Sequence, residues 1–305
     1  MAASQLEAIQ RSTIVRTFAF LERVAPRVGA RLAERLWFSV PRPRGRGDQL
    51  ATPGRPFRVQ LDGRGVVGEV WGEGPVVYLV HGWGGWRGQL GGLVDPLVSG
   101  GRRVVAFDAP SHGDSDPGPA GPGRSTILEF ADALAAVVAV HGPAHAVVAH
   151  SLGATAAAFA LRDGLPVGRM VFVAPMADPL PYTRLFADRL GFGERIRTRL
   201  VRRVERRVGR SMSAFDVPAM ARKLATPPLL LVHDRNDAET GWSDSAAIAQ
   251  AWPGARLVTT TGLGHRRILN APAVVAEVAA FVGTPPAGAG RPRPMDRRTG
   301  SGASR

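Results

Sequence analysis

Apolar residues change their spacing near residue 55, and each side of this point predicts a different kind of structure. Before it, they recur every three or four residues, which is typical of an amphipathic helix. This stripe consists of Ile14, Phe18, Leu21, Ala25, Val28 and Leu32. Pro26 predicts a break into two helices, because proline lacks an amide hydrogen and clashes inside a helix. We therefore expect residues 1–54 to form a helical extension that ends in a basic Pro/Gly linker, which begins with 41–48.

Between residues 55 and 284, short apolar runs alternate with helical stretches. The runs lie at 57–62, 66–72, 75–82, 102–110, 145–151, 168–175, 227–234 and 255–262. Continuous apolar strands without polar alternation suit a sheet that is buried on both faces. Helices are expected at 125–140, 152–162, 243–251 and 272–282. This alternation predicts the α/β class, with a mainly parallel central sheet flanked by helices.

One interval of this alternation is too long for a single crossover helix. It covers about residues 176–225, and its apolar positions repeat every four residues, at Ile196, Leu200, Val204 and Val208. Arginines fill the positions between them, so we expect a basic amphipathic helix inside an insertion. At the other end of the chain, residues 285–305 lack the apolar content to fold and are expected to form a disordered basic tail.

Composition narrows the function classes. The chain has no cysteine, which excludes disulfides and thiolate catalysis. No apolar run approaches the ~18 residues of a transmembrane helix. Charged residues interrupt the N-terminal apolar stretches, so we expect a cytoplasmic protein without a secretion signal.

The net charge of +14 comes from 39 basic residues, of which only Lys223 is a lysine. This excess reflects either a compositional bias or an anionic partner. No helix-turn-helix, zinc-finger or RNP-like pattern is recognisable, which disfavours nucleic acid. An acidic substrate and peripheral contact with a membrane surface both stay open.

The sharpest chemical signal is the segment AHSLG at 149–153, which joins an apolar strand to a helical stretch. It resembles the G-x-S-x-G nucleophile elbow of α/β-hydrolases, with Ala149 in place of the first glycine. Small residues are needed on both sides of Ser151, because the serine sits on a tight turn between neighbouring strands. Taken alone, the motif also suits a serine that only caps a core helix.

Candidate partners for this serine follow in the order that the resemblance requires, which is serine, acid, histidine. His265 lies in the Gly-rich loop TGLGHRRIL, and it is the only histidine after the candidate acids. Two carboxylates, Asp234 and Asp237, compete at the end of LLLVHDRND. The family spacing favours Asp237 as the residue that orients the imidazole, with Asp234 shaping the turn.

Two further segments resemble parts of the same family. HGWGG at 81–85 is similar to its oxyanion turn, which implies that the backbone amides of Trp83 and Leu152 hold the oxyanion. The Trp83 side chain would wall the acyl pocket. DAPSHGDS at 108–115 is similar to a loop that borders the site and has a structural role.

These elements span residues 75–270 in family order, and the chain resembles the α/β-hydrolase family of serine hydrolases. More narrowly, it is similar to small bacterial α/β-hydrolases with a helical N-terminal extension. The resemblance implies hydrolysis of a carboxylic ester or thioester through an acyl-serine intermediate, without metal or organic cofactor. Ser151 would be the nucleophile, His265 the base and Asp237 the orienting acid. Acyl chain length, leaving group and the choice among ester, thioester and C–C bonds stay open.

The resemblance also implies that the insertion forms a helical cap over the site of a single hydrolase domain at 55–284. The basic face of this cap would either attract an anionic substrate or remain a solvated surface. The arginines in question are Arg199, Arg202, Arg203 and Arg206.

Two other functions are weighed against this one. A dinucleotide-binding domain would use Gly82 and Gly84 after a strand and Asp108 at the end of the next. Against it, Arg87 stands where the third glycine is expected, and the Ser, Asp and His candidates are left unexplained. A non-enzymatic binding scaffold on the same fold is the other alternative, because fold does not fix function.

Overall fold

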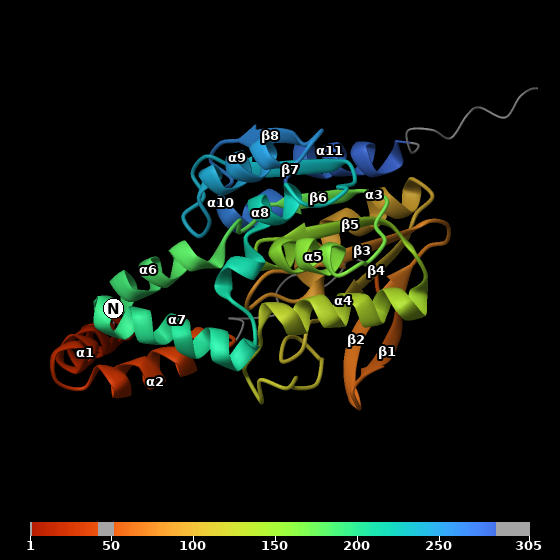
Figure 1. Cartoon of the computed structure of the whole chain (residues 1–305). Coiled ribbons are helices and arrows are strands. Elements are labelled where there is room, and N and C mark those ends of the chain that lie inside the picture. Colours follow the sequence, from red (N-terminus) through yellow and green to blue (C-terminus); the bar gives the residue numbers. More distant parts are fainter. Residues whose placement is uncertain (1, 42–51, 285–305) are drawn as a thin grey trace, which may run out of the picture.

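The computed structural model of the chain describes residues 2–41 and 52–284, with side chains from residue 12 onward. The tail expected at 285–305 and all but the first residue of the linker expected at 41–48 lie outside the described residues. Within them, the chain forms an α/β core and a helical lobe beside it (Figure 1).

The core contains one eight-stranded sheet in the order β1-β2-β4-β3-β5-β6-β7-β8. Its strands are β1 (Arg55–Leu61), β2 (Arg64–Trp71), β3 (Val76–Val80), β4 (Arg103–Phe107), β5 (Ala144–His150), β6 (Met170–Val173), β7 (Leu229–Asp234) and β8 (Arg256–Thr260). From β4 to β8 every neighbouring pair is parallel, whereas β1 and β2 add an antiparallel edge. Each strand coincides with one of the eight apolar runs, so the predicted α/β class with a mainly parallel sheet is confirmed.

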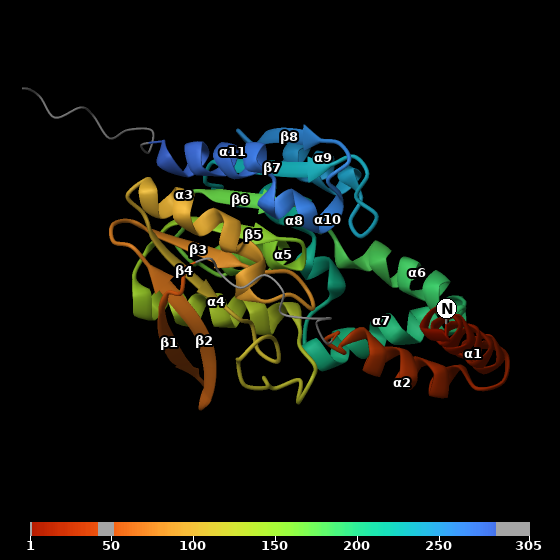
Figure 2. The ribbon, with the colours of Figure 1, turned by 180° about the vertical axis from the view of Figure 1, so that it is seen from behind.

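Helices cover both faces of this sheet (Figures 1 and 2). One face packs against α4 (Ile127–His141), α5 (Leu152–Arg162) and α9 (Trp242–Ala251). The other packs against α3 (Val94–Ser99), α11 (Pro272–Gly283) and the 3₁₀ turns η1 (Arg87–Leu93) and η3 (Ile268–Asn270). Burial on both sides explains why the central strands are apolar at consecutive positions.

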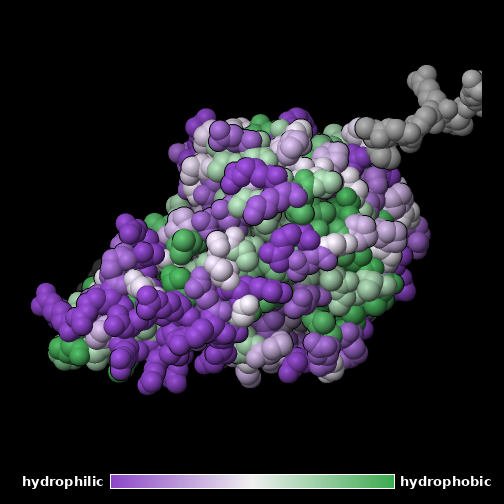
Figure 3. All heavy atoms as spheres, in the orientation of Figure 1, coloured by the Kyte–Doolittle hydropathy of each residue, from purple (hydrophilic) through white to green (hydrophobic). Residues whose placement is uncertain are grey.

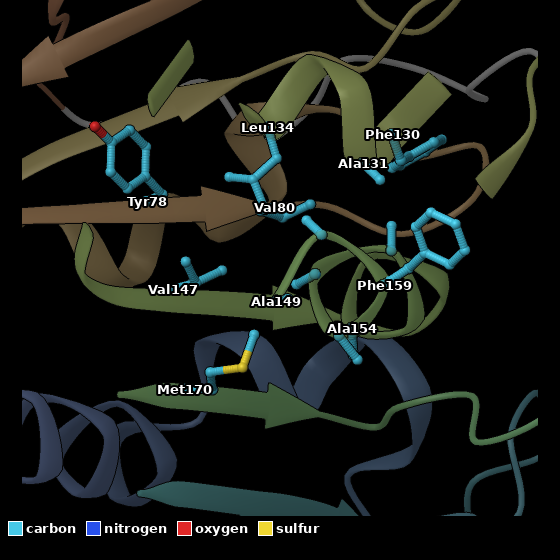
Figure 4. Packing of buried hydrophobic residues seen from close by; sticks show 14 of the residues in the cluster. Tyr78, Val80, Phe130, Ala131, Leu134, Val147, Ala149, Ala154, Phe159 and Met170 are labelled. Atoms are coloured by element: carbon cyan, nitrogen blue, oxygen red, sulfur yellow. The ribbon is translucent and has the colours of Figure 1, made fainter. Parts of the chain in front are cut away.

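The packing under α4 and α5 fixes the end of β5, where the candidate nucleophile follows. Val80 of β3 and Ala149 of β5 lie against these helices, with Ala154 of α5 close to the sheet (Figure 4). Both Ala149 and Ala154 are fully buried. Small side chains let α5 approach the strand from which it emerges, and this sets the tight turn between them.

The insertion between β6 and β7 contains α6 (Pro179–Leu190), α7 (Glu194–Val208), η2 (Met212–Phe215) and α8 (Val217–Ala221). At the start of the chain, α1 (Ala2–Val24) and α2 (Pro26–Trp37) form a hairpin that breaks at Pro26, as predicted. We call α1, α2, α6 and α7 the cap lobe. Figures 1 and 2 show this lobe at one end of the core, with α2 alongside α7.

The N-terminal stripe read from the sequence does not form one buried face. Phe18 is buried, but Ile14, Val28 and Leu32 are exposed. In α2 the buried positions are instead the small residues Gly29, Ala30 and Ala33, together with Glu34. A Cβ atom at Gly29 would collide with the side chain of Ile196 on α7. Close approach of the two helices therefore selects the small residues for burial and turns the larger ones outward.

Two carboxylates fasten the hairpin to α7. Glu22 of α1 accepts hydrogen bonds from the backbone amides of Arg195 and Ile196, at 2.9 and 3.0 Å. These amides belong to the first turn of α7, which has no side-chain cap of its own, so Glu22 caps the helix from another element. Glu34 of α2 is buried and pairs with Arg203 of α7.

Candidate active site

Ser151 occupies a strained turn between β5 and α5. Its φ angle is +54°, in the left-handed region that non-glycine residues rarely adopt. The backbone is held there by a 3.0 Å hydrogen bond from the Ser151 amide to the carbonyl of Val173. A Cβ at Gly153 would lie 2.4 Å from the carbonyl oxygen of His81, so only glycine fits two positions after the serine. The expected elbow geometry requires this close packing.

His265 and Asp237 meet beside this turn. His265 lies on the short helix α10 (Gly264–Arg267), and its Nδ1 is 2.7 Å from Oδ2 of Asp237. The side chain of Asp237 is fully buried and that of His265 is nearly so. With Nδ1 as the donor to this carboxylate, Nε2 is left to exchange a proton. Both Ser151 and His265 line the same cavity.

Asp237 is surrounded by donors. Its Oδ1 accepts the amides of Glu239 and Thr240, at 2.8 and 3.0 Å. Burial raises the pKa of the carboxyl group, but hydrogen bonds from His233 and His265 and from the Thr240 amide outweigh it, so that the pKa lies below its usual value. Asp237 is therefore a carboxylate at neutral pH. Thr240 and His233, which complete this arrangement, carried no signal in the sequence that distinguished them.

The competing carboxylate, Asp234, has different contacts. It accepts hydrogen bonds from the amides of Asn236 and Leu263 and from the Thr260 hydroxyl, at 2.8 to 2.9 Å. Burial raises its pKa, yet these donors lower it to about 2. Asp234 thus joins the loop after β7 to the loop that carries His265, and within the described residues it makes no hydrogen bond to the imidazole. This geometry agrees with a turn-shaping carboxylate.

Two buried histidines hold the glycine turn that follows β3. Nε2 of His81 accepts the amide of Ala109 at 3.0 Å, and Nε2 of His112 accepts the amide of Gly84 at 3.1 Å. Each Nδ1 faces a backbone carbonyl, so each ring is neutral with its proton on Nδ1. Burial lowers the pKa of His81 to about 4 and that of His112 to about 3.

This glycine turn lies directly against the candidate nucleophile. A Cβ at Gly82 would come within 2.9 Å of the Cβ of Ser151. Trp83 follows Gly82 and its side chain lines the cavity, while Leu152 begins α5. Their backbone amides are the two donors expected for an oxyanion, and both belong to segments that adjoin Ser151.

A cavity of about 470 Å³ extends from Ser151 and His265 toward the cap lobe. Its walls are mostly apolar and come from three parts of the chain. The core supplies Trp83, Ile127 and Leu152; the insertion supplies Met176, Leu185, Phe186, Val204, Val208, Met212 and Phe215; and the hairpin supplies Leu36, Trp37 and Phe38. The hairpin contribution was not predicted from the sequence, because nothing in the local pattern of residues 36–38 indicates what they face. Trp37 meets Phe186 edge to face across the lobe, with ring centroids 5.2 Å apart.

The four arginines expected to guide a substrate do not line the cavity. None of Arg199, Arg202, Arg203 and Arg206 is among the described residues that line the cavity. Arg203 instead pairs with Glu34 and so holds the hairpin. The arginines that do line the cavity are Arg189, Arg210 and Arg266, and all three are exposed.

Asp108, which a dinucleotide-binding domain would use for ribose, is fully buried and occupied. Its Oδ1 accepts the amide of Arg87 at 2.7 Å, and its Oδ2 meets the Arg87 guanidinium and the Asp114 amide. Arg87 also donates to Glu69 at 2.8 Å. This network explains why an arginine replaces the third glycine, and it leaves the Asp108 carboxylate without access to a ligand.

The fold and this site define a class: α/β proteins with a serine on a strained strand-to-helix turn at the carboxyl edge of a parallel sheet, beside a His–Asp pair. A model of the alpha/beta hydrolase family matches residues 77–278, which is more than half of the chain. The chain therefore belongs to the alpha/beta hydrolase family.

Solved structures agree on the fold. One is the esterase RhEst1 from Rhodococcus sp. ECU1013, at 20% identity over 76% of this chain and 99% of the esterase, with a TM-score of 0.56. Another is a bromoperoxidase from Bacillus anthracis, at 17% identity over 74% and 99%, with a TM-score of 0.55. A third is the thioesterase domain from the curacin biosynthetic pathway, at 17% identity over 76% and 100%, with a TM-score of 0.56. No curated protein matches the sequence. The different activities named for these neighbours mean that the fold alone does not select a substrate.

Proposed function

We propose that this protein is a serine hydrolase that cleaves a carboxylic ester or thioester through an acyl-serine intermediate. The observation that carries the proposal is the 2.7 Å contact between His265 and the buried Asp237, on the wall of the cavity that Ser151 also lines. A carboxylate in this position fixes the imidazole tautomer and stabilises the imidazolium that forms during the reaction.

In the first half of the proposed reaction, Oγ of Ser151 attacks the carbonyl carbon of the substrate while Nε2 of His265 takes the hydroxyl proton. The carbonyl oxygen becomes an oxyanion, which the amides of Trp83 and Leu152 stabilise. The tetrahedral intermediate then collapses, and His265 returns the proton to the departing alcohol or thiol. The acyl group remains on Ser151 as an ester.

In the second half, His265 takes a proton from a water molecule that attacks the acyl carbon. Collapse of the second tetrahedral intermediate breaks the bond to Oγ, and His265 returns the proton to Ser151. The products are a carboxylic acid and the free enzyme. No step uses a metal ion or an organic cofactor.

The cavity favours a substrate whose acyl group is apolar and binds inside it. Its apolar walls favour hydrocarbon, and its volume lies in the range of about 300–1,000 Å³ that is common for small-molecule sites. Structural neighbours named as an esterase and a thioesterase are consistent with either leaving group. The ester or thioester substrate is therefore proposed without a choice between the two.

The test compares Ser151→Ala with Ser99→Ala, an exposed serine at the end of α3. A fluorophosphonate probe should label the wild type and Ser99→Ala, whereas Ser151→Ala should be unlabelled and should lose hydrolysis of p-nitrophenyl esters and acyl-CoAs. Circular dichroism should be the same for all three. A wild type that is neither labelled nor active would favour the binding scaffold, and an active Ser151→Ala would move the nucleophile elsewhere.

A further inference from the structure

A repeating Arg–apolar pair runs along the outer side of the hairpin, and we call it the hairpin row. Its members are Arg23 and Val24, Arg27 and Val28, Arg31 and Leu32, and Arg35 and Leu36. The pairs follow one another every four residues through the break at Pro26, and all eight residues are exposed. Phe20 extends the apolar side by one further turn and is 63% exposed.

The apolar members of the hairpin row are not needed to pack the hairpin. The side of α2 that meets α7 consists of small residues and Glu34, as described above. In α7, by contrast, Ile196, Leu200 and Val204 are buried. Figure 3 shows hydrophobic residues at the surface over the turn between α1 and α2, next to strongly hydrophilic ones. A run of exposed aliphatic residues on one side of a helix indicates a contact surface.

The charge of this surface is all of one sign. The described side chains of the hairpin include two carboxylates, Glu22 and Glu34, and both are turned toward α7. The outward side is left with arginines. Alternating aliphatic and cationic side chains on an amphipathic helix of low overall hydrophobicity are what a helix needs to lie in the interface of an anionic membrane.

We propose that the hairpin row docks the protein on the surface of an anionic lipid bilayer. The arginines would contact lipid phosphates, and the aliphatic side chains would enter the boundary between headgroups and acyl chains. Within the described part of the chain, no helix has both the length and the apolar content to cross a bilayer. A second copy of the chain is a poor occupant, because two chains of net charge +14 repel each other.

The row ends at the cavity. Leu36 is both the last member of the row and a residue of the cavity wall, and exposed Leu185 of α6 lines the cavity as well. Docking would therefore bring an apolar entrance close to the lipid. If the proposed hydrolase function holds, this arrangement favours a lipid-phase ester or thioester as substrate. The docking itself does not depend on that function.

The first experiment measures binding of the full chain to sedimented vesicles of phosphatidylcholine, with and without phosphatidylglycerol. The wild type should bind the anionic vesicles and bind pure phosphatidylcholine much more weakly. Val28→Asp should lower the affinity for anionic vesicles at least about tenfold, because each charge near such a surface counts. Val140→Asp on α4 is the matched control, because it makes the same substitution at another exposed valine. It lies outside the hairpin row, so it should change the affinity for anionic vesicles by no more than about twofold. Equal losses in the two variants, or no binding by the wild type, would overturn the proposal.

The second experiment separates the row from net charge. Arg27→Ser with Arg31→Ser should weaken vesicle binding about 30-fold. Arg64→Ser with Arg222→Ser removes the same charge from exposed sites outside the hairpin and should have a much smaller effect. If the row arginines matter but Val28→Asp behaves like its control, the surface binds polyanions rather than a bilayer, and the proposal is wrong.

Two further readouts keep the outcomes distinct. In sedimentation velocity, the wild type should not self-associate through this surface. Self-association that is present in the wild type and lost in Val28→Asp would assign the surface to a second copy of the chain instead. Binding is measured on Ser151→Ala as well, and Val28→Asp is assayed on a water-soluble ester, on which it should match the wild type. Val28→Asp should thus lose vesicle binding and keep hydrolysis, which tests the docking surface. Ser151→Ala should keep vesicle binding and lose hydrolysis, which tests the proposed reaction.

Discussion

The end of the sheet that carries Ser151 and the cap lobe are held in place by different groups. At the Ser151 end, buried neutral rings accept backbone amides, as in the contacts of His81 with Ala109 and of His112 with Gly84. In the cap lobe, the hairpin is fastened to α7 by the side chains of Glu22 and Glu34. The two rings lie buried in the core, whereas the two carboxylates join one helix to another outside it, and such contacts can break without unfolding the core.

This difference suggests a division of roles. In the proposed reaction, residues at the Ser151 end would position the reacting atoms within the tolerance that the chemistry needs. Residues of the cap lobe shape the cavity and its entrance, and changes there should act on the substrates accepted more than on the chemical step. The following predictions test this division, beginning with the largest expected effect.

The first prediction concerns the two carboxylates after β7. Asp237→Asn should lower kcat by about 10³–10⁴-fold, because the amide favours the wrong imidazole tautomer. Asp234→Asn is its control, with the same change three positions away, and it should mainly lower the melting temperature. Steady-state kinetics and thermal melts of both variants check this. The reverse pattern would transfer the orienting role to Asp234.

The second prediction concerns pH and the glycine turn. Since the folded protein holds His81 and His112 neutral, with pKa values of about 4 and about 3, the unfolded chain binds protons below about pH 6.5 that the folded chain does not. Stability should therefore fall as pH decreases from about 6.5, and the decline should end once the folded pKa values are passed.

His112→Gln offers an amide oxygen to the Gly84 amide without titrating in this range, so it should flatten the dependence of melting temperature on pH. His145→Gln, at a partly exposed histidine, should flatten it less. Melts recorded between pH 7.5 and 4 distinguish the two variants. An unchanged slope in His112→Gln would mean that this ring is not the titrating group.

The third prediction concerns the attachment of the hairpin. Glu34→Gln leaves Arg203 without its partner and should weaken docking of the hairpin by about 1–3 kcal/mol. Hydrogen exchange should increase in α2 while the sheet stays protected, and KM for long-chain esters should rise more than kcat falls. Glu194→Gln, at an exposed ion pair on the same lobe, should cost less than about 1 kcal/mol. Global unfolding in Glu34→Gln would show that the lobe and the core are not separable.

The smallest effect is expected for the exposed arginines that line the cavity. Arg189→Ser or Arg210→Ser should lower kcat/KM for a carboxylate-bearing ester about two- to fivefold at low salt, and added salt should remove the difference. A neutral ester of equal length should respond little. Arg199→Ser and Arg202→Ser, on α7 but outside the cavity lining, serve as controls. Equal responses to salt for both substrates would leave these arginines as a solvated surface.

Most of the core could be predicted from local patterns. Apolar runs located the eight strands of the described sheet. The strands β3 to β7 are buried on both faces and so have few polar positions, whereas β1 and β8 at the two edges are more exposed. Small residues around Ser151 indicated the tight turn, since a larger neighbour has no room there. The positions of His265 and Asp237 followed from the order of the motifs, and the structure brings them within hydrogen-bonding distance. Their catalytic role stays a prediction until the variants are assayed.

The cap lobe was predicted less well. Spacing identified α7 and its buried side correctly, but the same rule misassigned α2, where Gly29 and Ala33 are buried in place of Val28 and Leu32. The hydrophobicity of a residue indicates how much free energy its burial would contribute. How closely α2 and α7 approach each other depends instead on the size of the residues between them. A pattern rule that considers one helix at a time contains no information about its neighbour.

By itself, then, the sequence determined the strands, the helices expected at 125–140, 152–162, 243–251 and 272–282, the break at Pro26 and the chemical types gathered at the carboxyl edge of the sheet. These features depend on the spacing of nearby residues and on backbone stereochemistry, and both are set by residues that are close together in the sequence. Only the tertiary structure decided that Glu22 caps a helix through Arg195, 173 residues later, that Leu36 and Trp37 line the cavity, and that a row of Arg–apolar pairs faces outward. Such outcomes depend on which surfaces meet, and contacts between distant segments are set by the packing of the whole chain.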